Sequence, residues 1–248
     1  MSLQQIDVSA GKELSPCGWW GTIGGFLKED FSNLLSSLSS HHTRCMQQNP
    51  STSQIHAWKT SMHYLAEALT LLVGEKPEAP NWGLLLEYEL PRERGRRPDA
   101  ILLAPEHLVI IEFKESQSVL PEYLDQVKAY ARDLNEYHSA SHDLLAIPVL
   151  AIGGNQPHFK RSDAVVTGSL NLGGTLKALL NEASGKAPDL RSWIAADYSP
   201  LPTLVSAART IFRHEPLPSI RRAQSAGIPK AIEKLSAVAV TAREKGQK

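Results

Sequence analysis

The stretch LVIIEFK, residues 108–114, decides the fold of this chain. Four consecutive apolar residues are typical of a central β-strand that is buried on both faces. Because strand side chains alternate, Glu112 and Lys114 point to one face and Phe113 points to the other. A carboxylate that follows such a run is costly to bury unless it is paired or bound to a metal. The alternative is a position open to solvent, with Glu112 paired to Lys114.

Two more strands precede this one. We expect them over residues 82–90 and 99–103, with a polar turn at residues 92–97 and a short turn at residues 104–107. Consecutive strands joined by such short turns form hairpins. If the second and third strands pair through the turn at residues 104–107, Asp99 lies beside Glu112.

Helical patterns flank these strands. Residues 54–73 carry apolar side chains at spacings of three and four, which predicts an amphipathic helix that Gly74 and Pro77 end. A second helix follows the third strand, with Ser118 as its cap and Pro121 in its first turn. A fourth strand over residues 144–152 comes next, closed by a glycine pair. Residues 16–35 are expected to be a loop entering a short helix, residues 165–166 a fifth strand, and residues 173–183 a further helix.

The order of helix, three strands, helix and strand predicts an α/β fold with a mixed central sheet flanked by helices. The chain has 248 residues, 42% of them hydrophobic, which is enough for a full core in one or two domains. Residues 201–248 hold nine basic and three acidic side chains, a net charge of +6, so residues 1–200 carry −6. We therefore expect a domain over residues 1–200, with its core at about 54–152. A basic extension or linker, helical in character, is expected over residues 201–248.

Several classes of protein are not supported by the sequence. No apolar run approaches the ~20 residues of a membrane-spanning helix, and no signal peptide is evident. Cys17 and Cys45 are too few for a disulfide framework or a four-cysteine metal site, which predicts reduced thiols in a cytoplasmic protein. The histidines show no metal-binding spacing with these cysteines.

The chemistry-bearing residues gather around the second and third strands. Asp99 and Glu112 would place two carboxylates beside the ammonium group of Lys114 at one edge of the sheet. Oxygen ligands of this kind suit Mg²⁺ or Mn²⁺. On the following helix, Gln126 and Tyr130 are four residues apart and share a face, so both can approach the same site.

These residues resemble a known signature. Pro98-Asp99 and Glu112-Phe113-Lys114 are similar to the motif of the PD-(D/E)XK nuclease superfamily, and Gln126 with Tyr130 resembles the additional motif of its RecB-like branch. The resemblance implies a restriction-endonuclease-like core with the order α-β-β-β-α-β. It implies a Mg²⁺ site, with Mn²⁺ able to substitute.

The resemblance also implies a role for each residue. Asp99, Glu112 and the backbone carbonyl of Phe113 would bind the metal. Lys114 would orient the attacking water. Gln126 would position the water or the scissile phosphate, and Tyr130 would pack on the bound strand. Superfamily nucleases usually have one more acid, for which Glu67, Glu87 and Glu89 are the candidates. A hairpin turn centred near residue 94 would place Glu89 across from Asp99.

Four arginines, Arg92, Arg94, Arg96 and Arg97, lie in the turn before Asp99. They could hold backbone phosphates of a nucleic acid, and the equally weighted alternative is pairing with the neighbouring glutamates. Residues 87–92 and 97–99 also resemble the amino-terminal nuclease-like domain of bacterial Schlafen-related nuclease–helicases. In those proteins this region leads into a P-loop ATPase, whereas no G-x-x-x-x-G-K-[ST] motif occurs in this chain.

The resulting expectation is a metal-dependent nuclease that acts on nucleic acid, with DNA favoured over RNA and endonuclease over exonuclease activity. Its context would be anti-phage defence or DNA processing, with a helicase or ATPase domain as partner in cis or trans and no membrane. Self-association as a homo-oligomer is left open. The alternative is a catalytically inactive module of the same fold that binds nucleic acid or such a partner.

Overall fold

The computed structural model of the chain describes residues 15–91, 95–200 and 212–213. The chain divides into two compact units, Met1–Ser199 and Pro200–Lys248. The extension expected over residues 201–248 lies outside the described residues, apart from Phe212 and Arg213. Within the described part of the chain, no helix combines the length and apolar character that crossing a bilayer requires.

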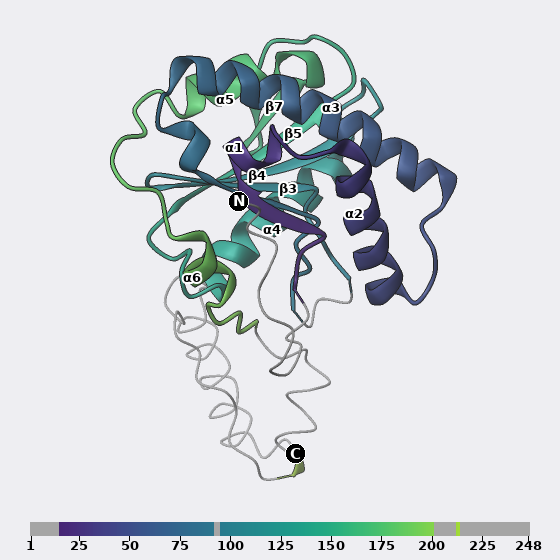
Figure 1. Cartoon of the computed structure of the whole chain (residues 1–248). Coiled ribbons are helices and arrows are strands. Elements are labelled where there is room, and N and C mark those ends of the chain that lie inside the picture. Colours follow the sequence, from purple (N-terminus) through teal and green to yellow (C-terminus); the bar gives the residue numbers. More distant parts are fainter. Residues whose placement is uncertain (1–14, 92–94, 201–211, 214–248) are drawn as a thin grey trace, which may run out of the picture. The chain divides into compact units, whose positions relative to one another are not determined.

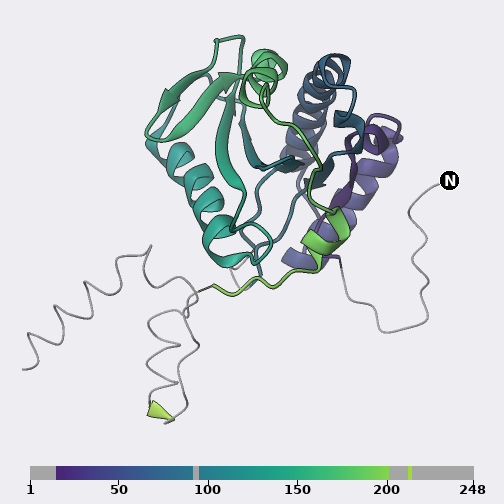
Figure 2. The same cartoon turned by 90° about the vertical axis from the view of Figure 1, so that its left-hand side faces the viewer.

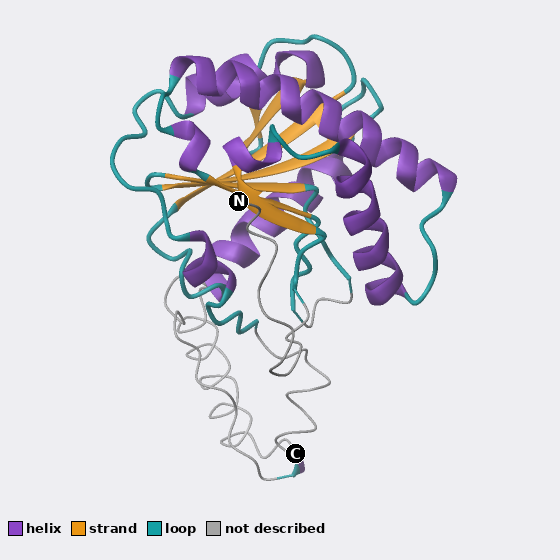
Figure 3. Ribbon diagram, viewed as in Figure 1, coloured by secondary structure: helices purple, strands orange, loops and turns teal. Residues whose placement is uncertain are grey.

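The first unit is a mixed β-sheet between two layers of helices (Figure 1; strands orange in Figure 3). Its seven strands lie in the order β1-β2-β3-β4-β5-β7-β6, so β4 occupies the middle. Neighbouring strands are antiparallel from β1 to β4 and again between β7 and β6, whereas β4, β5 and β7 run parallel. The strands are β1 (Trp19–Thr22), β2 (Gly83–Leu86), β3 (Ala100–Ala104), β4 (His107–Lys114), β5 (Leu145–Ile152), β6 (Phe159–Arg161) and β7 (Ala164–Gly168).

Helices cover both faces of the sheet. α3 (Thr52–Glu75) and α5 (Leu172–Leu179) pack on one face, and α4 (Pro121–Tyr137) and α6 (Leu190–Ile194) pack on the other. Figure 2 shows α4 and the strands from a second side. The short α1 (Ile23–Phe26) and α2 (Phe31–Met46) contribute to the same core as α3. The α/β class and the mixed sheet flanked by helices predicted from the sequence are therefore confirmed.

The strand predicted from LVIIEFK is the centre of the sheet. All four of its apolar residues, 108–111, are fully buried, with β3 on one side and β5 on the other. β3 and β4 pair through a two-residue turn in which Glu106 has φ 59°, a left-handed conformation that closes tight hairpins. β4 and β5 are parallel, and α4 makes the crossover that such a connection needs. The hairpin and both flanking helices match the sequence expectation.

Several local predictions were wrong. β2 ends at Leu86 instead of Leu90, because Glu87 adopts φ 51° and leaves the extended conformation. Ser118 does not cap α4, whose N-cap is Leu120 with no side-chain hydrogen bond, although Pro121 does occupy the first turn as predicted. The segment expected to be a loop before the first helix contains β1, and the edge strand β6 was missed because all three of its residues are exposed.

Candidate active site

The β3–β4 register brings the two predicted carboxylates together. Ala100 is opposite Ile111, so the next pair outward is Asp99 and Glu112. Asp99 Oδ2 accepts a hydrogen bond of 2.7 Å from the backbone N–H of Phe113, which fixes the carboxylate at the end of β4. The Phe113 side chain points to the opposite face and packs against the α3 core, as the strand alternation predicts.

Glu112 is the most deeply buried acid of this group, with 3% of its surface exposed. Its Oε1 accepts a 2.8 Å hydrogen bond from Lys114 Nζ. Its Oε2 is buried and has no hydrogen-bond partner among the described residues. The solvent-exposed alternative for Glu112 is therefore wrong, while its pairing with Lys114 is observed. An ionised carboxylate with one buried oxygen left unsatisfied is a costly arrangement that an additional positive partner would relieve.

Burial and mutual repulsion set the protonation of these acids. Burial raises the pKa of Glu112 to about 7, against the opposing attraction of Lys114. Burial also raises the pKa of Asp99 well above its usual range, and repulsion from Glu112 and Glu87 adds to this effect. Although burial of Lys114 acts in the opposite direction, Glu112 and Asp99 raise the pKa of its ammonium group. Lys114 is therefore protonated at neutral pH. A further cation would lower the electrostatic free energy of the two acids beside it.

Of the three candidates for a third acid, Glu87 is the one that lies next to Asp99. It lies directly after β2, where its backbone N–H donates a 3.1 Å hydrogen bond to the Asp99 carbonyl. Its left-handed backbone costs about 1–2 kcal/mol for a residue with a side chain. The side chain is held by the indole N–H of Trp58, which donates to Oε1 at 2.8 Å, and by an ion pair of 2.9 Å between Arg97 Nε and Oε2. Strained residues persist where the surroundings fix them in this way.

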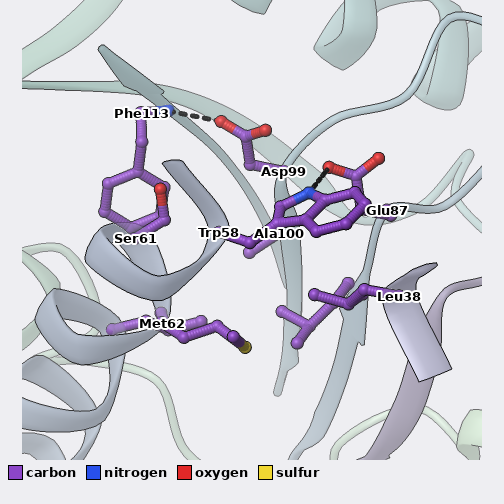
Figure 4. A pocket seen from close by; sticks show the side chains of 10 residues that line it. Leu38, Trp58, Ser61, Met62, Glu87, Asp99, Ala100 and Phe113 are labelled. Atoms are coloured by element: carbon purple, nitrogen blue, oxygen red, sulfur yellow. Dashed lines mark hydrogen bonds between the residues drawn. The ribbon is translucent and has the colours of Figure 1, made fainter. Parts of the chain in front are cut away.

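A small pocket opens beside these acids on the α3 side of the sheet (Figure 4). Apolar side chains from α2, α3 and the sheet form most of its lining, and Glu87 and Asp99 supply two of its polar groups. In Figure 4 the Trp58 indole lies between the helix and the Glu87 carboxylate. Glu87 and Asp99 are thus bordered by an apolar wall, which strengthens their electrostatic interactions.

The other two candidates for the third acid lie elsewhere. Glu67 is exposed and its Oε1 lies 3.2 Å from His63 Nε2 on the outer surface of α3. Glu89 accepts a 2.8 Å hydrogen bond from the thiol of Cys45 instead of facing Asp99. The predicted position of Glu89 opposite Asp99 is wrong because the β2–β3 register differs by two residues: Leu86 is opposite Ala100, so Glu87 follows as the neighbour of Asp99.

Gln126 and Tyr130 lie together on α4, as their spacing predicts. Gln126 Nε2 donates a 3.1 Å hydrogen bond to the Tyr130 hydroxyl. Burial raises the pKa of Tyr130, and the charges of Glu112 and Asp99 add to this rise. Gln126 and Tyr130 are therefore in contact with each other, and the two acids act electrostatically on Tyr130.

The arginines of the turn before Asp99 are engaged with acids where they are described. Arg96 Nη1 lies 2.8 Å from Asp133 Oδ2, and the Arg96 guanidinium stacks over the Tyr130 ring at 5.1 Å. Arg97 pairs with Glu87. Arg92 and Arg94 lie outside the described residues. The predicted alternative of pairing with a neighbouring glutamate is therefore confirmed for Arg97, whereas Arg96 pairs with an aspartate on α4 that the sequence did not suggest.

No protein-family model matches the chain, and no curated protein or solved structure is significantly similar to it. The geometry of Asp99, Glu112 and their neighbours is therefore the basis for a functional proposal.

A second polar cluster was missed by the sequence reasoning. His41 and Cys45, four residues apart on α2, meet Glu89, and their ligand atoms all lie within 4.8 Å of one another. However, Arg44 Nη2 lies 2.7 Å from His41 Nδ1, so the guanidinium donates to this nitrogen and the imidazole proton is left on Nε2. Burial lowers the pKa of His41, and the positive charges of Arg44 and Arg97 lower it further, to about 4. Two guanidinium groups beside these ligands oppose cation binding, and the hydrogen bonds satisfy the cluster.

Proposed function

We propose that this chain is a divalent-metal-dependent nuclease that hydrolyses phosphodiester bonds in nucleic acid, with DNA as the favoured substrate and a restriction-endonuclease-like core. The observation that carries the proposal is the buried Glu112 Oε2, which has no partner among the described residues and belongs to a group of three mutually repelling acids. A divalent cation would satisfy this oxygen and relieve the repulsion, and oxygen donors are the ligands that Mg²⁺ and Mn²⁺ prefer. The order α3, β2, β3, β4, α4, β5 supports the proposed core.

Carboxylate and carbonyl oxygens are the kind of donor that such an ion takes. Asp99, Glu112 and the backbone carbonyl of Phe113 would hold Mg²⁺ or Mn²⁺, with Glu87 as the third acid. When bound, the ion polarises a phosphate oxygen and lowers the pKa of a coordinated water. Burial and mutual repulsion make the unbound acids electrostatically unfavourable, so a cation beside them would lower their free energy.

The remaining residues would act on water and phosphate. The protonated Lys114 can orient the attacking water and stabilise the negative charge that develops on the phosphate. The Gln126 amide oxygen could accept a hydrogen bond from that water, because the amide nitrogen is the atom that donates to the Tyr130 hydroxyl. Tyr130 would fix the orientation of Gln126 through this hydrogen bond.

A cleavage assay tests this proposal directly. Closed-circular DNA, linear duplex DNA, single-stranded DNA and RNA are incubated with Mg²⁺, Mn²⁺ or EDTA. The wild type is compared with Lys114→Ala and with the control Lys128→Ala, whose side chain pairs with Asp125 on the surface of α4. We expect metal-dependent cutting that Lys114→Ala reduces by about 10²–10⁴-fold, with the control within twofold of wild type. Cutting of closed circles would identify an endonuclease. Full activity of Lys114→Ala would refute the assigned roles.

A catalytically inactive module of the same fold is the second candidate. The observation that favours it is the Lys114–Glu112 ion pair, because one oxygen of the expected ligand is already occupied. Such a module would bind nucleic acid or an ATPase partner without cutting. Absence of Mn²⁺ binding, measured by calorimetry on the folded wild type, would support this candidate over the nuclease. A role in anti-phage defence or DNA processing is proposed only on the sequence resemblance.

A further inference from the structure

The ammonium group of Lys114 has a second partner besides Glu112. Lys114 Nζ lies over the ring of Tyr123 on α4, 5.1 Å from the ring centroid. The face of an aromatic ring carries negative potential and attracts a cation within about 6 Å. Glu112 Oε1 accepts a 2.8 Å hydrogen bond from the same nitrogen. One ammonium group is therefore held by a carboxylate on β4 and by an aromatic face on α4.

The Tyr123 ring is fixed by the helix on which it lies. Tyr123 is in the first turn of α4, where its backbone N–H donates a 3.2 Å hydrogen bond to the Leu120 carbonyl. Its side chain is partly buried and packs against the apolar core on the α4 side of the sheet. The ring of Tyr130, further along the same helix, carries the Arg96 guanidinium instead. Among the described residues, Tyr123 is thus the ring over which Lys114 lies.

Two contacts from different elements restrict the ammonium group more than one contact does. Lysine has a flexible stem of four carbons, and holding its ammonium group in one place costs conformational entropy. A single ion pair leaves the group free to swing around the carboxylate, whereas an aromatic face on another element removes this freedom before a substrate binds. Glu112 accepts one of the N–H donors, and no other hydrogen bond from Lys114 is found among the described residues. Donors therefore remain for water and for a phosphate oxygen.

We propose that Tyr123 is a positioning residue, whose ring face holds the Lys114 ammonium group in place for the attacking water and the phosphate. This inference rests on the proposed nuclease function. It adds to that function a residue outside the motif that the sequence resembles. Because the ring acts through Lys114, its loss should lower kcat and leave KM unchanged. A ring that stacked on a base of the substrate would instead affect KM.

Nuclear magnetic resonance tests the contact without substrate or metal. The full chain is prepared with isotope-labelled lysine, and the Lys114 signal is identified by its loss in Lys114→Ala. Ring currents shift protons above an aromatic face upfield. The ε-methylene protons of Lys114 should therefore lie upfield of those of Lys128, which pairs with Asp125 on the surface of α4. The upfield shift should persist in Tyr123→Phe and disappear in Tyr123→Leu.

Cleavage kinetics with Mg²⁺ test the consequence for the reaction. Tyr123→Leu should lower kcat by about 2–30-fold, the factor that corresponds to the loss of a cation–π contact, with KM within about twofold of wild type. Tyr123→Phe should keep the wild-type kcat, because it retains the ring and removes only the hydroxyl. Tyr64→Leu is the matched control, because Tyr64 is a half-buried tyrosine on α3, which covers the other face of the sheet. Its activity should equal that of wild type.

Each alternative outcome is informative. A raised KM with unchanged kcat in Tyr123→Leu would overturn the positioning role in favour of stacking on a base. An equal loss of kcat in Tyr123→Phe would overturn it too, because the hydroxyl would then carry the effect. If circular dichroism shows that Tyr123→Leu does not fold, the wild-type spectrum decides: Lys114 protons without an upfield shift refute the contact. A folded wild type that cuts no nucleic acid would overturn the proposed function, while the magnetic resonance result still decides whether the ring holds Lys114.

Discussion

Replacing Glu112 with glutamine should stabilise the fold above pH 7 while abolishing metal binding. In the unfolded chain the carboxyl has its usual pKa of 4.5, whereas burial raises the pKa to about 7 in the folded protein. Below pH 4.5 the Glu112 carboxyl is protonated in both the folded and the unfolded protein. As the pH rises from 4.5 to 7, the unfolded state loses its proton first, so the folded state loses stability. At ~1.4 kcal/mol per pH unit, the charged carboxylate costs about 3 kcal/mol at pH 8.

Glutamine removes this cost and still offers an amide oxygen to Lys114, so about 3 kcal/mol is the upper limit of the gain at pH 8. For a domain of this size that gain corresponds to a rise in Tm of roughly 6–12 °C. The assay is urea unfolding of both proteins at pH 5 and pH 8 in EDTA, with Lys114→Met as a control for loss of the pair. The variant should be more stable than wild type at pH 8 and nearly equal to it at pH 5. An equal stability difference at both pH values would refute the assignment of a destabilising buried charge to Glu112.

Three further predictions concern the surroundings of the site. Gly153→Ala should destabilise the fold by about 1–3 kcal/mol in urea unfolding, because its Cβ would lie 2.3 Å from the Glu115 carbonyl oxygen; wild-type stability would show that this loop can move aside. Ile110→Ala should cost about 2–5 kcal/mol, since this residue is fully buried in the central strand, and a cost below 1 kcal/mol would contradict its place in the core. Glu67→Ala should leave the Mn²⁺ affinity unchanged and change the free energy of unfolding by no more than about 0.5 kcal/mol, because among the described residues Glu67 pairs with the exposed His63. A tenfold loss of Mn²⁺ affinity would show instead that Glu67 belongs to the metal site.

The sequence predicted the centre of this fold well because the signals there are local. The apolar run of β4 and the two-residue turn before it determine a hairpin, and the hairpin register places Asp99 beside Glu112. The spacing of Gln126 and Tyr130 likewise determines their contact, since a helix places residues four apart on one face. These parts of the candidate site depend on neighbours within about thirty residues along the chain.

The third acid could not be predicted in the same way. Which candidate lies opposite Asp99 depends on the β2–β3 register, which places Leu86 opposite Ala100. Glu87 then takes a left-handed conformation that contacts with Trp58 and Arg97 stabilise. Such tertiary contacts override the preference of a glutamate for extended or helical backbone. The cluster of His41 with Glu89 was missed for a similar reason, because it joins α2 to a loop more than forty residues later.

The β3–β4 hairpin also has a kinetic consequence for the chain. Its two-residue turn, like that of the β6–β7 hairpin, leaves a minimal loop to close. By contrast, some sixty residues separate β1 from β2, and β5 pairs with β4 only across the helix α4. We expect the hairpin to form early, while Asp99 and Glu112 are still hydrated and their repulsion is weak. The repulsion grows only when α3 and α4 later cover the sheet. A divalent cation should therefore accelerate the late step of folding and slow unfolding, and leave the first step unchanged.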